Sequence, residues 1–571
     1  MSYDGTKWCI RTVANRYTIG YDYGTNSVRA LAVDIDTGEE VATAVFNYPS
    51  GKAGLFLSNI DPLLTRQNPA DYITGFVTTT RDILKSIAGE QVIGLGFDTT
   101  GSSPMPIDKS GTPICQLPGF ANDLDSYVWI WKDHTAHDEA VEITQLSQKM
   151  GLPYMAKYGG KYSSEWFWSK ILHCARTSPL VFEQAYSWAE ICDWIPAFLS
   201  GNQAPDRMKR SVCAAAHKAI YAEEWGGLPS EEFLAKLDPR LKTLRLRLYH
   251  EVYTSDKIAG YLTPEFAQAT GLPPEIPLAV GAFDAHLGAV ASCVAPNVLV
   301  KIMGTSTCDC MVHPLNDPLP DIPGLCGIVK ESILPGYYGL EAGQSAVGDI
   351  FNWVSHFSQV SHEKLTQGAS KLQPGQSGLM LLDWHNGNRT VLVDQLLTGV
   401  TIGQTLATTP ADLYRAAIEA TAFGSLKIID RMEEYGAKVD QVVACGGIAE
   451  KSTLAMQIYA DVFNRPVWIA ASSQTCALGS AIVASVAAQA FPSIEKAQAQ
   501  LARLRPKPYV PNPEAVETYK QLYKIYLNLH DAFGLGEPID LGETMKSLIA
   551  IREEITERLS KIGENYAAKQ D

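Results

Sequence analysis

Two neighbouring segments in the middle of the chain carry residue types suited to proton transfer and to phosphate binding. An apolar run ends at Asp284, which is followed by a helix-forming stretch of small residues. A second apolar run, residues 298–303, ends in Gly-Thr-Ser-Thr at residues 304–307. A carboxylate at a helix start can accept a proton, and a loop of this composition can present amides to a phosphate. Such a carboxylate can equally cap the helix, and the residue types leave both roles open.

A similar unit occurs near the N-terminus. Residues 17–35 predict two strands joined by a tight loop, in which Gly24, Thr25 and Asn26 closely follow Asp22. Asp22 can hold a hydrated Mg²⁺ ion and the loop amides can bind phosphate, although a plain hairpin turn has the same composition. The repetition of the unit in both halves favours two phosphate loops that face each other across a cleft between two domains.

The segments around these loops alternate between strand and helix patterns. Residues 92–97 predict a buried strand that ends in the polar run 98–103, and residues 442–444 predict a strand that ends in Cys-Gly-Gly. Polar residues after a buried strand often line a crevice, and a double glycine lets a flat ring approach the backbone, but plain turns explain both segments equally well. Helices are predicted over residues 69–88, 187–201, 410–435, 475–488, 513–529 and 544–562.

Length and composition restrict the class of protein. A chain of 571 residues exceeds what one core holds, so two large domains are expected. The formal net charge of -15 argues against nucleic acid and against an anionic membrane as partners. No apolar run is long enough for a membrane span. The eleven cysteines form no CxxC pair and the N-terminus lacks an apolar signal core, which predicts reduced thiols and a cytoplasmic protein.

Nine segments between residues 19 and 466 carry a recognisable pattern. They are IGYDYGTNSVRALAVD (19–34), GFDTTGSSPMPID (96–108), WKDHTA (131–136), YSSEWFWSKILH (162–173), GAFDAHLGAV (281–290), GTSTCD (304–309), GLEAGQSAVGDIFNW (339–353), LDWHNGNRT (382–390) and CGGIAEKSTLAMQIYADVFNRP (445–466). With them the chain resembles the FGGY carbohydrate kinases. The glycine–threonine loops and the double glycine are shared across that family. The segments that begin at residues 131, 162 and 304 are narrower and resemble the members that phosphorylate ribulose.

The resemblance implies an α/β fold of two ribonuclease-H-like domains, of the actin and hexokinase type, around a central cleft. We expect a sugar-binding and catalytic-base domain over residues 1–290, a nucleotide-binding domain over 291–535 and a helical extension over 536–571. The implied activity is ATP-dependent phosphorylation of L-ribulose to L-ribulose 5-phosphate in L-arabinose degradation, with ATP and Mg²⁺. A homodimer is a further expectation.

The family's motifs also imply roles for individual positions. Asp284 corresponds to the general base and Asp22 to a residue near magnesium. Four positions correspond to ketopentose contacts: Gly101, Lys218, Asp284 and Glu341. Eight positions correspond to nucleotide and phosphate contacts: Gly24, Thr25, Asn26, Gly304, Thr305, Gly348, Asn352 and Gly447. One departure is Ala285, where a cysteine is expected in close members.

Two other interpretations remain open at this point. The first is a kinase of another pentulose, such as D-ribulose or xylulose, because the loops shared across the family do not select the sugar. The second is an ATP-gated binding protein of the actin or chaperone kind without sugar chemistry, which predicts no need for Asp284.

Overall fold

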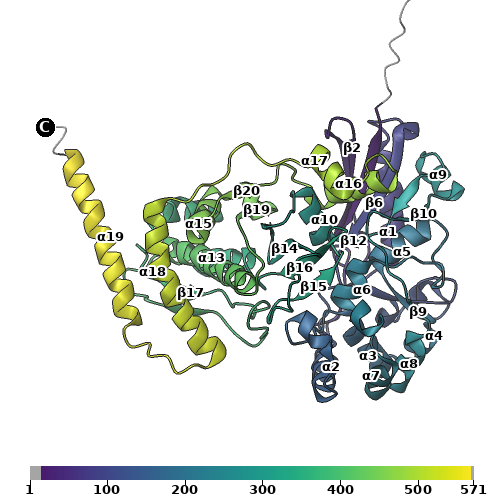
Figure 1. Ribbon diagram of the computed structural model, residues 1–571, viewed down its shortest axis with the longest axis horizontal. Helices are drawn as coiled ribbons and strands as arrows, with labels where there is room; N and C mark the ends of the chain where they lie inside the picture. Colours follow the sequence, from purple (N-terminus) through teal and green to yellow (C-terminus); the bar gives the residue numbers. More distant parts are fainter. Residues whose placement is uncertain (1–14, 568–571) are drawn as a thin grey trace, which may run out of the picture.

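The computed structural model describes residues 15–567, and each half of the chain is built on a mixed β-sheet with helices packed around it (Figure 1). This agrees with the expected α/β architecture. Residues 1–14, which make up most of the N-terminal segment expected to lack an apolar signal core, lie outside the described range. Residues 1 and 571, where the first expected domain begins and the last one ends, also lie outside it. Within that range, no helix is sufficiently long and apolar to cross a bilayer.

The first sheet contains the predicted N-terminal hairpin. Its three leading strands form an antiparallel meander, and β6 runs parallel to β1 on the other side. Beyond β6 follow β11, β12 and β10. The strands of this sheet are β1 (Tyr17–Tyr23), β2 (Ser27–Asp34), β3 (Glu40–Asn47), β6 (Val92–Thr99), β10 (Ile258–Tyr261), β11 (Pro277–Ala279) and β12 (Ala282–Phe283).

The second sheet repeats this arrangement. A hairpin of β13 and β14 has a further antiparallel strand, β16, on one side and the parallel strand β19 on the other. The similarity of the two hairpins in the sequence is therefore a similarity of sheet topology. The strands are β13 (Val298–Met303), β14 (Thr307–Pro314), β15 (Gly327–Lys330), β16 (Tyr337–Ala342), β19 (Gln441–Cys445) and β20 (Val467–Ile469).

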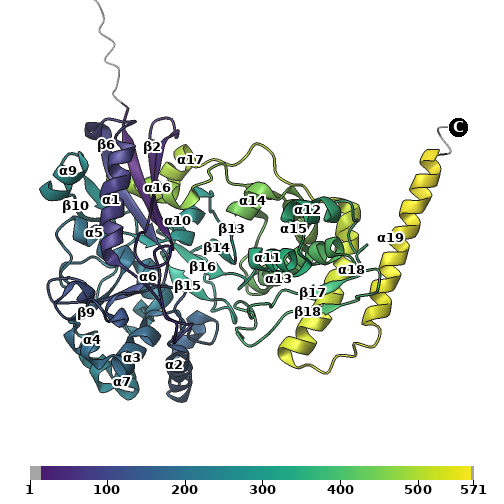
Figure 2. The ribbon, with the colours of Figure 1, turned by 180° about the vertical axis from the view of Figure 1, so that it is seen from behind.

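A helix from the second half packs on the sheet of the first half. A Cβ atom at Gly20 of β1 would lie 1.8 Å from the carbonyl oxygen of Ala477 in α16 (Thr475–Ala487), and one at Gly96 of β6 would lie 1.9 Å from that of Ser480. Glycine in the strands and small residues in the helix therefore permit a very close approach. Figure 2 shows α16 beside α10 (Asp284–Ala291) at the junction of the two halves.

The other helices surround the two sheets. In the first half they are α1 (Pro69–Ile83), α2 (His137–Lys149), α3 (Phe167–Thr177), α4 (Pro179–Gln184), α5 (Ile191–Leu199), α6 (Val212–Lys218), α7 (Glu231–Leu237), α8 (Pro239–Arg245) and α9 (Pro264–Thr270). In the second half they are α11 (Gly348–Ser358), α12 (His362–Ala369), α13 (Pro410–Glu434), α14 (Gly447–Lys451), α15 (Thr453–Phe463), α17 (Ile494–Leu501), α18 (Pro513–His530) and α19 (Thr544–Ala567). In Figure 1, α19 lies at the end of the molecule opposite the first sheet.

The predicted helix over residues 187–201 is wrong in its first part. Ser187–Glu190 form strand β9, which pairs antiparallel with β7 (Pro104–Ile107), and the helix α5 begins only at Ile191. All four residues of β9 are buried. A short buried strand has no polar alternation, so its pattern cannot be separated from that of a buried helix.

Candidate active site

Three aspartates come together at the carboxyl ends of adjacent parallel strands. The central strand β6 has β1 on one side and β12 on the other, and Asp22 of β1 is in register with Asp98 of β6. Ala282 of β12 is also in register with Asp98, and Asp284 begins α10 directly beyond β12. Because the carboxyl ends of parallel strands meet at one edge of a sheet, three carboxylates from distant parts of the sequence share that edge.

The first turn of α10 holds the carboxylate of Asp284. Its Oδ1 atom accepts a 2.7 Å hydrogen bond from the amide of Ala285, and a helix N-terminus favours negative charge. Burial, together with repulsion by Asp22, nevertheless raises the pKa of Asp284 to about 7. Asp284 therefore belongs to the helix start and remains basic enough to accept a proton near neutral pH.

Asp98 is the fully buried member of the three. Its Oδ2 atom accepts a 2.7 Å hydrogen bond from the Ser480 hydroxyl of α16, whereas Oδ1 has no hydrogen-bond partner. Burial, together with repulsion by Asp22, raises the pKa of Asp98 well above its usual range. Burial also raises the pKa of Asp22, against an opposing effect of Arg29. Neighbouring carboxylates with an unpartnered buried oxygen fit a hard divalent cation such as Mg²⁺.

A lysine–glutamate pair lies close enough for its charges to act on Asp284. The ammonium of Lys218, at the end of α6, donates a 2.8 Å hydrogen bond to Glu341 of β16. Burial acts to lower the pKa of Lys218, but the charge of Glu341 outweighs it and raises that pKa. The indole ring of Trp166 lies 5.1 Å from the ammonium. The pair is therefore an ammonium and a carboxylate, which offer a donor and an acceptor to neighbouring hydroxyls.

Gly101 brings a polar loop close to the end of β12. A Cβ atom at this position would lie 2.2 Å from the ring of Phe283, so only glycine fits. Below the loop, Glu190 accepts a hydrogen bond from the Ser102 hydroxyl, and the ammonium of Lys170 donates to the Ser102 carbonyl at 2.9 Å. Burial raises the pKa of Glu190 to about 7 and lowers that of Lys170 to about 8. These two buried groups fix the loop that carries Gly101.

In both predicted phosphate loops the glycine amide closes the turn. The amide of Gly24 donates to the carbonyl of Ser27 at 3.0 Å, and the amide of Gly304 donates to that of Ser306 at 2.9 Å. These two amides are therefore not free for a phosphate. The amides and hydroxyls of the residues that follow the glycine remain available to bind a phosphate in such loops.

Side chains from distant segments hold the first loop in place. The Thr25 carbonyl accepts a 2.6 Å hydrogen bond from Gln67, and the Thr25 hydroxyl lies 3.1 Å from the indole nitrogen of Trp131. The side-chain amide of Asn26 donates to the Ala53 carbonyl at 2.7 Å. Thr25 and Asn26 therefore have fixed positions before any ligand binds.

The second loop is held by the start of α11. The Thr305 carbonyl accepts hydrogen bonds from the amides of Val347 at 2.8 Å and Asp349 at 3.2 Å. A Cβ atom at Gly348 would lie 2.6 Å from the Gly304 carbonyl, so glycine is needed where the helix meets the loop. The loop and the first turn of α11 form one unit.

The double glycine after β19 lies against the end of β13. Gly446 has a φ of +90°, and a Cβ atom there would lie 2.6 Å from the Met303 carbonyl, whereas a Cβ atom at Gly447 meets no atom within 4 Å. The open space at Gly447 fits the approach of a flat ring. Asn352 lies on an exposed face of α11, where its side chain contacts His362 at 2.9 Å.

The start of α16 lies between the two strand edges. The thiol of Cys476 lies near the charges of Asp22, Asp98 and Asp284, which raise its pKa in addition to burial. The neighbouring Thr475 lies close enough to the thiol of Cys445, at the end of β19, to act on its pKa. The carboxylates of the first sheet and the glycine loops of the second therefore meet around one helix N-terminus.

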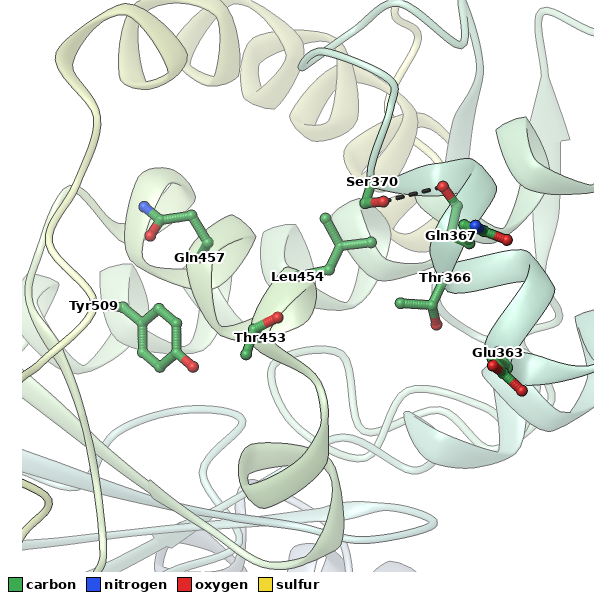
Figure 3. Close-up of a pocket in the computed structure, with 8 residues that line it drawn as sticks. All are labelled: Glu363, Thr366, Gln367, Ser370, Thr453, Leu454, Gln457 and Tyr509. Atoms are coloured by element: carbon green, nitrogen blue, oxygen red, sulfur yellow. Dashed lines mark hydrogen bonds between the residues drawn. The ribbon is translucent and has the colours of Figure 1, made fainter.

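A further hollow lies in the second half of the chain. It is open, has a volume of about 550 Å³ and lies between α12, the start of α15 and Tyr509 (Figure 3). None of the predicted site residues lines it. Its walls carry polar side chains such as Glu363 and Gln457, and neither the three aspartates nor the two phosphate loops line it.

Four residues without a predicted role are buried at or beside the site. Asp98 lay in a run whose sequence fitted a plain turn equally well. His217 and His286 contact Glu341, and their only sequence signal is their closeness to Lys218 and Asp284. Lys301 forms a buried ion pair with Asp309 next to the second loop.

Comparison with known proteins gives consistent results. Residues 17–291 match the N-terminal domain, and residues 299–488 the C-terminal domain, of the FGGY family of carbohydrate kinases. The chain is 41% identical over 558 residues to a ribulokinase of Shouchella clausii, covering 93% of this chain and 98% of the relative. It is 42% identical over 561 residues to a ribulokinase of Geobacillus thermodenitrificans, covering 94% and 97%.

Solved structures extend the similarity to more distant kinases. A xyloylose kinase from Brucella ovis superposes with a TM-score of 0.77 at 19% identity, covering 91% of this chain and 100% of the other. A gluconate kinase from Lactobacillus acidophilus gives a TM-score of 0.75 at 19% identity, covering 92% and 100%. At this identity the likeness concerns the fold alone.

Proposed function

Because this chain belongs to the FGGY family of carbohydrate kinases, we propose that it transfers the γ-phosphoryl group of ATP to ribulose. The choice of sugar is supported by the ribulokinases that are 41% and 42% identical over almost the whole chain. The observation that carries the chemistry is the position of Asp284, a carboxylate with a pKa of about 7 that lies near the Lys218–Glu341 pair.

In the proposed reaction Asp284 acts as the general base. The 5-hydroxyl oxygen of the sugar attacks the γ-phosphorus, the new O–P bond forms, the bond to ADP breaks and the hydroxyl proton passes to Asp284. Lys218 and Glu341 bind sugar hydroxyls as donor and acceptor, and the backbone at Gly101 lies against the same region. Fixing the sugar in this way contributes more than covalent chemistry does in phosphoryl transfer.

The nucleotide side consists of the two loops and the double glycine. We assign the loop of Gly24, Thr25 and Asn26 to one side of the phosphates and that of Gly304 and Thr305 to the other, with the two glycines closing the turns and the residues after them facing the phosphates. Gly348, Asn352 and Gly447 lie along the nucleotide in this proposal. Asp22 would hold Mg²⁺, and the unpartnered oxygen of Asp98 supports a cation at this edge. When bound, Mg²⁺ neutralises charge on the phosphates.

Several finer assignments belong to the same proposal. The sugar is L-ribulose, the product is L-ribulose 5-phosphate and the pathway is L-arabinose degradation. The domains divide at residues 290 and 535. A cytoplasmic location is supported by the free thiols of the ten cysteines in the described part of the chain and by the use of ATP. The homodimer stays a prediction.

The two alternative functions are no longer equally supported. The matching family consists of kinases, so an ATP-gated binding protein without catalysis is no longer a candidate. A kinase of D-ribulose or xylulose remains the second candidate, because Gly101, Lys218, Asp284 and Glu341 can bind hydroxyls of any pentulose.

A coupled assay of ADP release across L-ribulose, D-ribulose, xylulose and glycerol tests the proposal. We expect the highest kcat/KM with L-ribulose and the lowest with glycerol. A preference for xylulose would replace ribulose by the second candidate. The absence of substrate-dependent ADP release with all four compounds would contradict the proposed reaction.

A further inference from the structure

Two buried histidines flank the carboxylate of Glu341. Nδ1 of His217, in α6, lies 3.5 Å from Oε2 of Glu341, and Nε2 of His286, in α10, lies 3.3 Å from the same oxygen. The other carboxylate oxygen, Oε1, accepts the hydrogen bond from Lys218. The two imidazole rings are 4.6 Å apart, and neither residue is more than 1% exposed. Three donors from two helices therefore surround one carboxylate.

The outer ring nitrogens face groups that can donate a proton. Nε2 of His217 lies 2.9 Å from the hydroxyl of Ser332, and Nδ1 of His286 lies 2.7 Å from the thiol of Cys213. When these groups donate, each neutral ring carries its own proton on the nitrogen that faces Glu341. Neither inner nitrogen has a hydrogen-bond partner in this structure, and each lies within 3.5 Å of Oε2 of Glu341. Both rings are thus set to donate to Oε2.

We propose that His217 and His286 are positioning residues that hold Glu341 as an ionised acceptor with one place left for a sugar hydroxyl. A carboxylate accepts about four hydrogen bonds; Lys218 takes one, and in the proposed arrangement the two rings take two more. The remaining place accepts only a donor, so the site requires a hydroxyl there. This inference rests on the proposed function, in which Glu341 contacts the ketopentose.

A cation site is the competing interpretation of the same residues. The ligand atoms of His217, His286 and Glu341 lie within 4.8 Å of one another, as in a metal site. The ammonium of Lys218 favours the hydrogen-bonded arrangement, because it lies 2.8 Å from the same carboxylate and repels a dication.

The electrostatics of the cluster agree with an ionised Glu341. Burial acts to raise its pKa, but Lys218 and then the two histidines outweigh burial and hold the pKa well below its usual range. Loss of a histidine donor raises that pKa. The titratable and charged groups around Glu341 come from several elements: Lys218, His217 and Cys213 of α6, Asp284 and His286 of α10, Cys310 of β14, and Cys326 and Arg389 in loops.

Paired substitutions test the proposal. H217N and H286Q keep an N–H group near the inner nitrogen, whereas H217L and H286L remove it. We expect each leucine variant to raise the KM for the sugar about tenfold or more, with a smaller change in kcat and an unchanged KM for ATP. In the D284N background, where Asp284 no longer titrates, the acidic limb of sugar binding moves to higher pH in the leucine variants, and H217N and H286Q restore both properties.

A histidine–carboxylate pair away from the site provides a matched control. His173 of α3 contacts Glu139 of α2 at 3.0 Å, so H173L removes a histidine–carboxylate pair in the same way and leaves the sugar KM unchanged. If the leucine variants do not fold, S332A and C213A provide a second test. These variants keep both rings but remove the groups that fix which ring nitrogen carries the proton. These two variants are then expected to raise the sugar KM by a smaller factor.

Three outcomes would overturn the proposal. An unchanged sugar KM in all of these variants removes the role of the histidines. A raised KM without movement of the acidic limb indicates a merely structural effect. Stoichiometric Zn²⁺ binding to the wild-type protein, lost in both leucine variants, identifies a cation site instead. The sugar used is the ketopentose that the wild-type protein phosphorylates best, so a wrong choice of ribulose appears in the wild type and leaves the histidine test intact.

Discussion

Both phosphate-loop hairpins place an acid opposite a base across their two strands, but the two pairs are built differently. In the first hairpin Asp22 is in register with Arg29, whose side chain is exposed and opposes the effect of burial on Asp22 without overcoming it. In the second hairpin Lys301 is in register with Asp309. Both residues are fully buried, and the ammonium lies 2.9 and 3.0 Å from the two carboxylate oxygens.

The two acids therefore have different roles: Asp22 is available to a ligand, whereas Asp309 stabilises the fold. Asp309 is neutralised by Lys301, which also contacts Gln344 at 3.0 Å, so this pair supports the strands on either side of the second loop. Asp22 lacks such a close partner and lies beside Asp98 and Asp284 instead. We therefore expect substitutions near the first hairpin to change catalysis and those in the second pair to change stability.

The largest effect is expected for D284N, which removes the proposed base beside the first hairpin. We expect kcat to fall by about 10³-fold with a much smaller change in the sugar KM. The coupled assay measures both, and D317N, at a largely exposed position, is the control. Sugar-dependent ADP release that survives D284N would remove the catalytic assignment.

The raised pKa of Asp284 also predicts two effects of pH. The base must be ionised, so wild-type kcat/KM falls as the pH drops below about 7. The folded-state pKa lies above the unfolded value of about 3.9, so ionisation destabilises the folded protein as the pH rises through this window. D284N is therefore expected to raise the melting temperature at pH 8 relative to wild type, and a lower melting temperature there would contradict this account.

The next largest effect after D284N is expected in the dependence of the reaction rate on Mg²⁺. D22N removes an anionic oxygen from the proposed cation site, and we expect the Mg²⁺ concentration for half-maximal rate to rise about tenfold. Titration of Mg²⁺ at saturating sugar measures this value. R29Q changes the exposed partner across the hairpin and serves as the control. A shift of equal size and opposite direction in R29Q would mean that net charge, not ligation, matters.

The third effect concerns stability. K301M leaves Asp309 buried without its cation, so we expect the free energy of unfolding to fall by about 3–5 kcal/mol. R29M, which removes the base of the cross-strand pair in the first hairpin, should change it by about 0.5 kcal/mol or less. Denaturant unfolding distinguishes them. The double variant K301M/D309L should recover most of the loss, and equal losses in K301M and R29M would abolish the contrast between the hairpins.

The smallest effect is expected at the double glycine beside the second hairpin. G447V adds a side chain where no protein atom lies within 4 Å of the Cβ position, so the fold should tolerate it while the KM for ATP rises several-fold. G446V is the matched variant, because its Cβ would clash with the Met303 carbonyl and its φ is positive; it should mainly destabilise the protein. An unchanged KM for ATP in G447V would move the nucleotide away from this turn.

Local patterns in the sequence were sufficient for much of the fold. The two hairpins, the strand that ends in Asp98 and the helix over residues 410–434 follow from residue period and turn composition, which act over a few neighbours. Residues 187–190 were assigned wrongly because a fully buried strand and a buried helix have the same composition. The predicted helix over 69–88 ends at Ile83 for a related reason, since helix ends depend on a few capping contacts.

The sequence by itself determined the two loops, the acids beside them and, through its motifs, the family. Only the tertiary structure decided which residues meet, because contacts between distant segments leave no regular spacing in the chain. His217 and His286 come from two helices and meet Glu341 of a strand. Helix α16 of the second half packs closely on the sheet of the first half because Gly20 and Gly96 have no side chain. The structure also decided that the glycine amides of both loops close their own turns, so the residues after them are left to meet the phosphates.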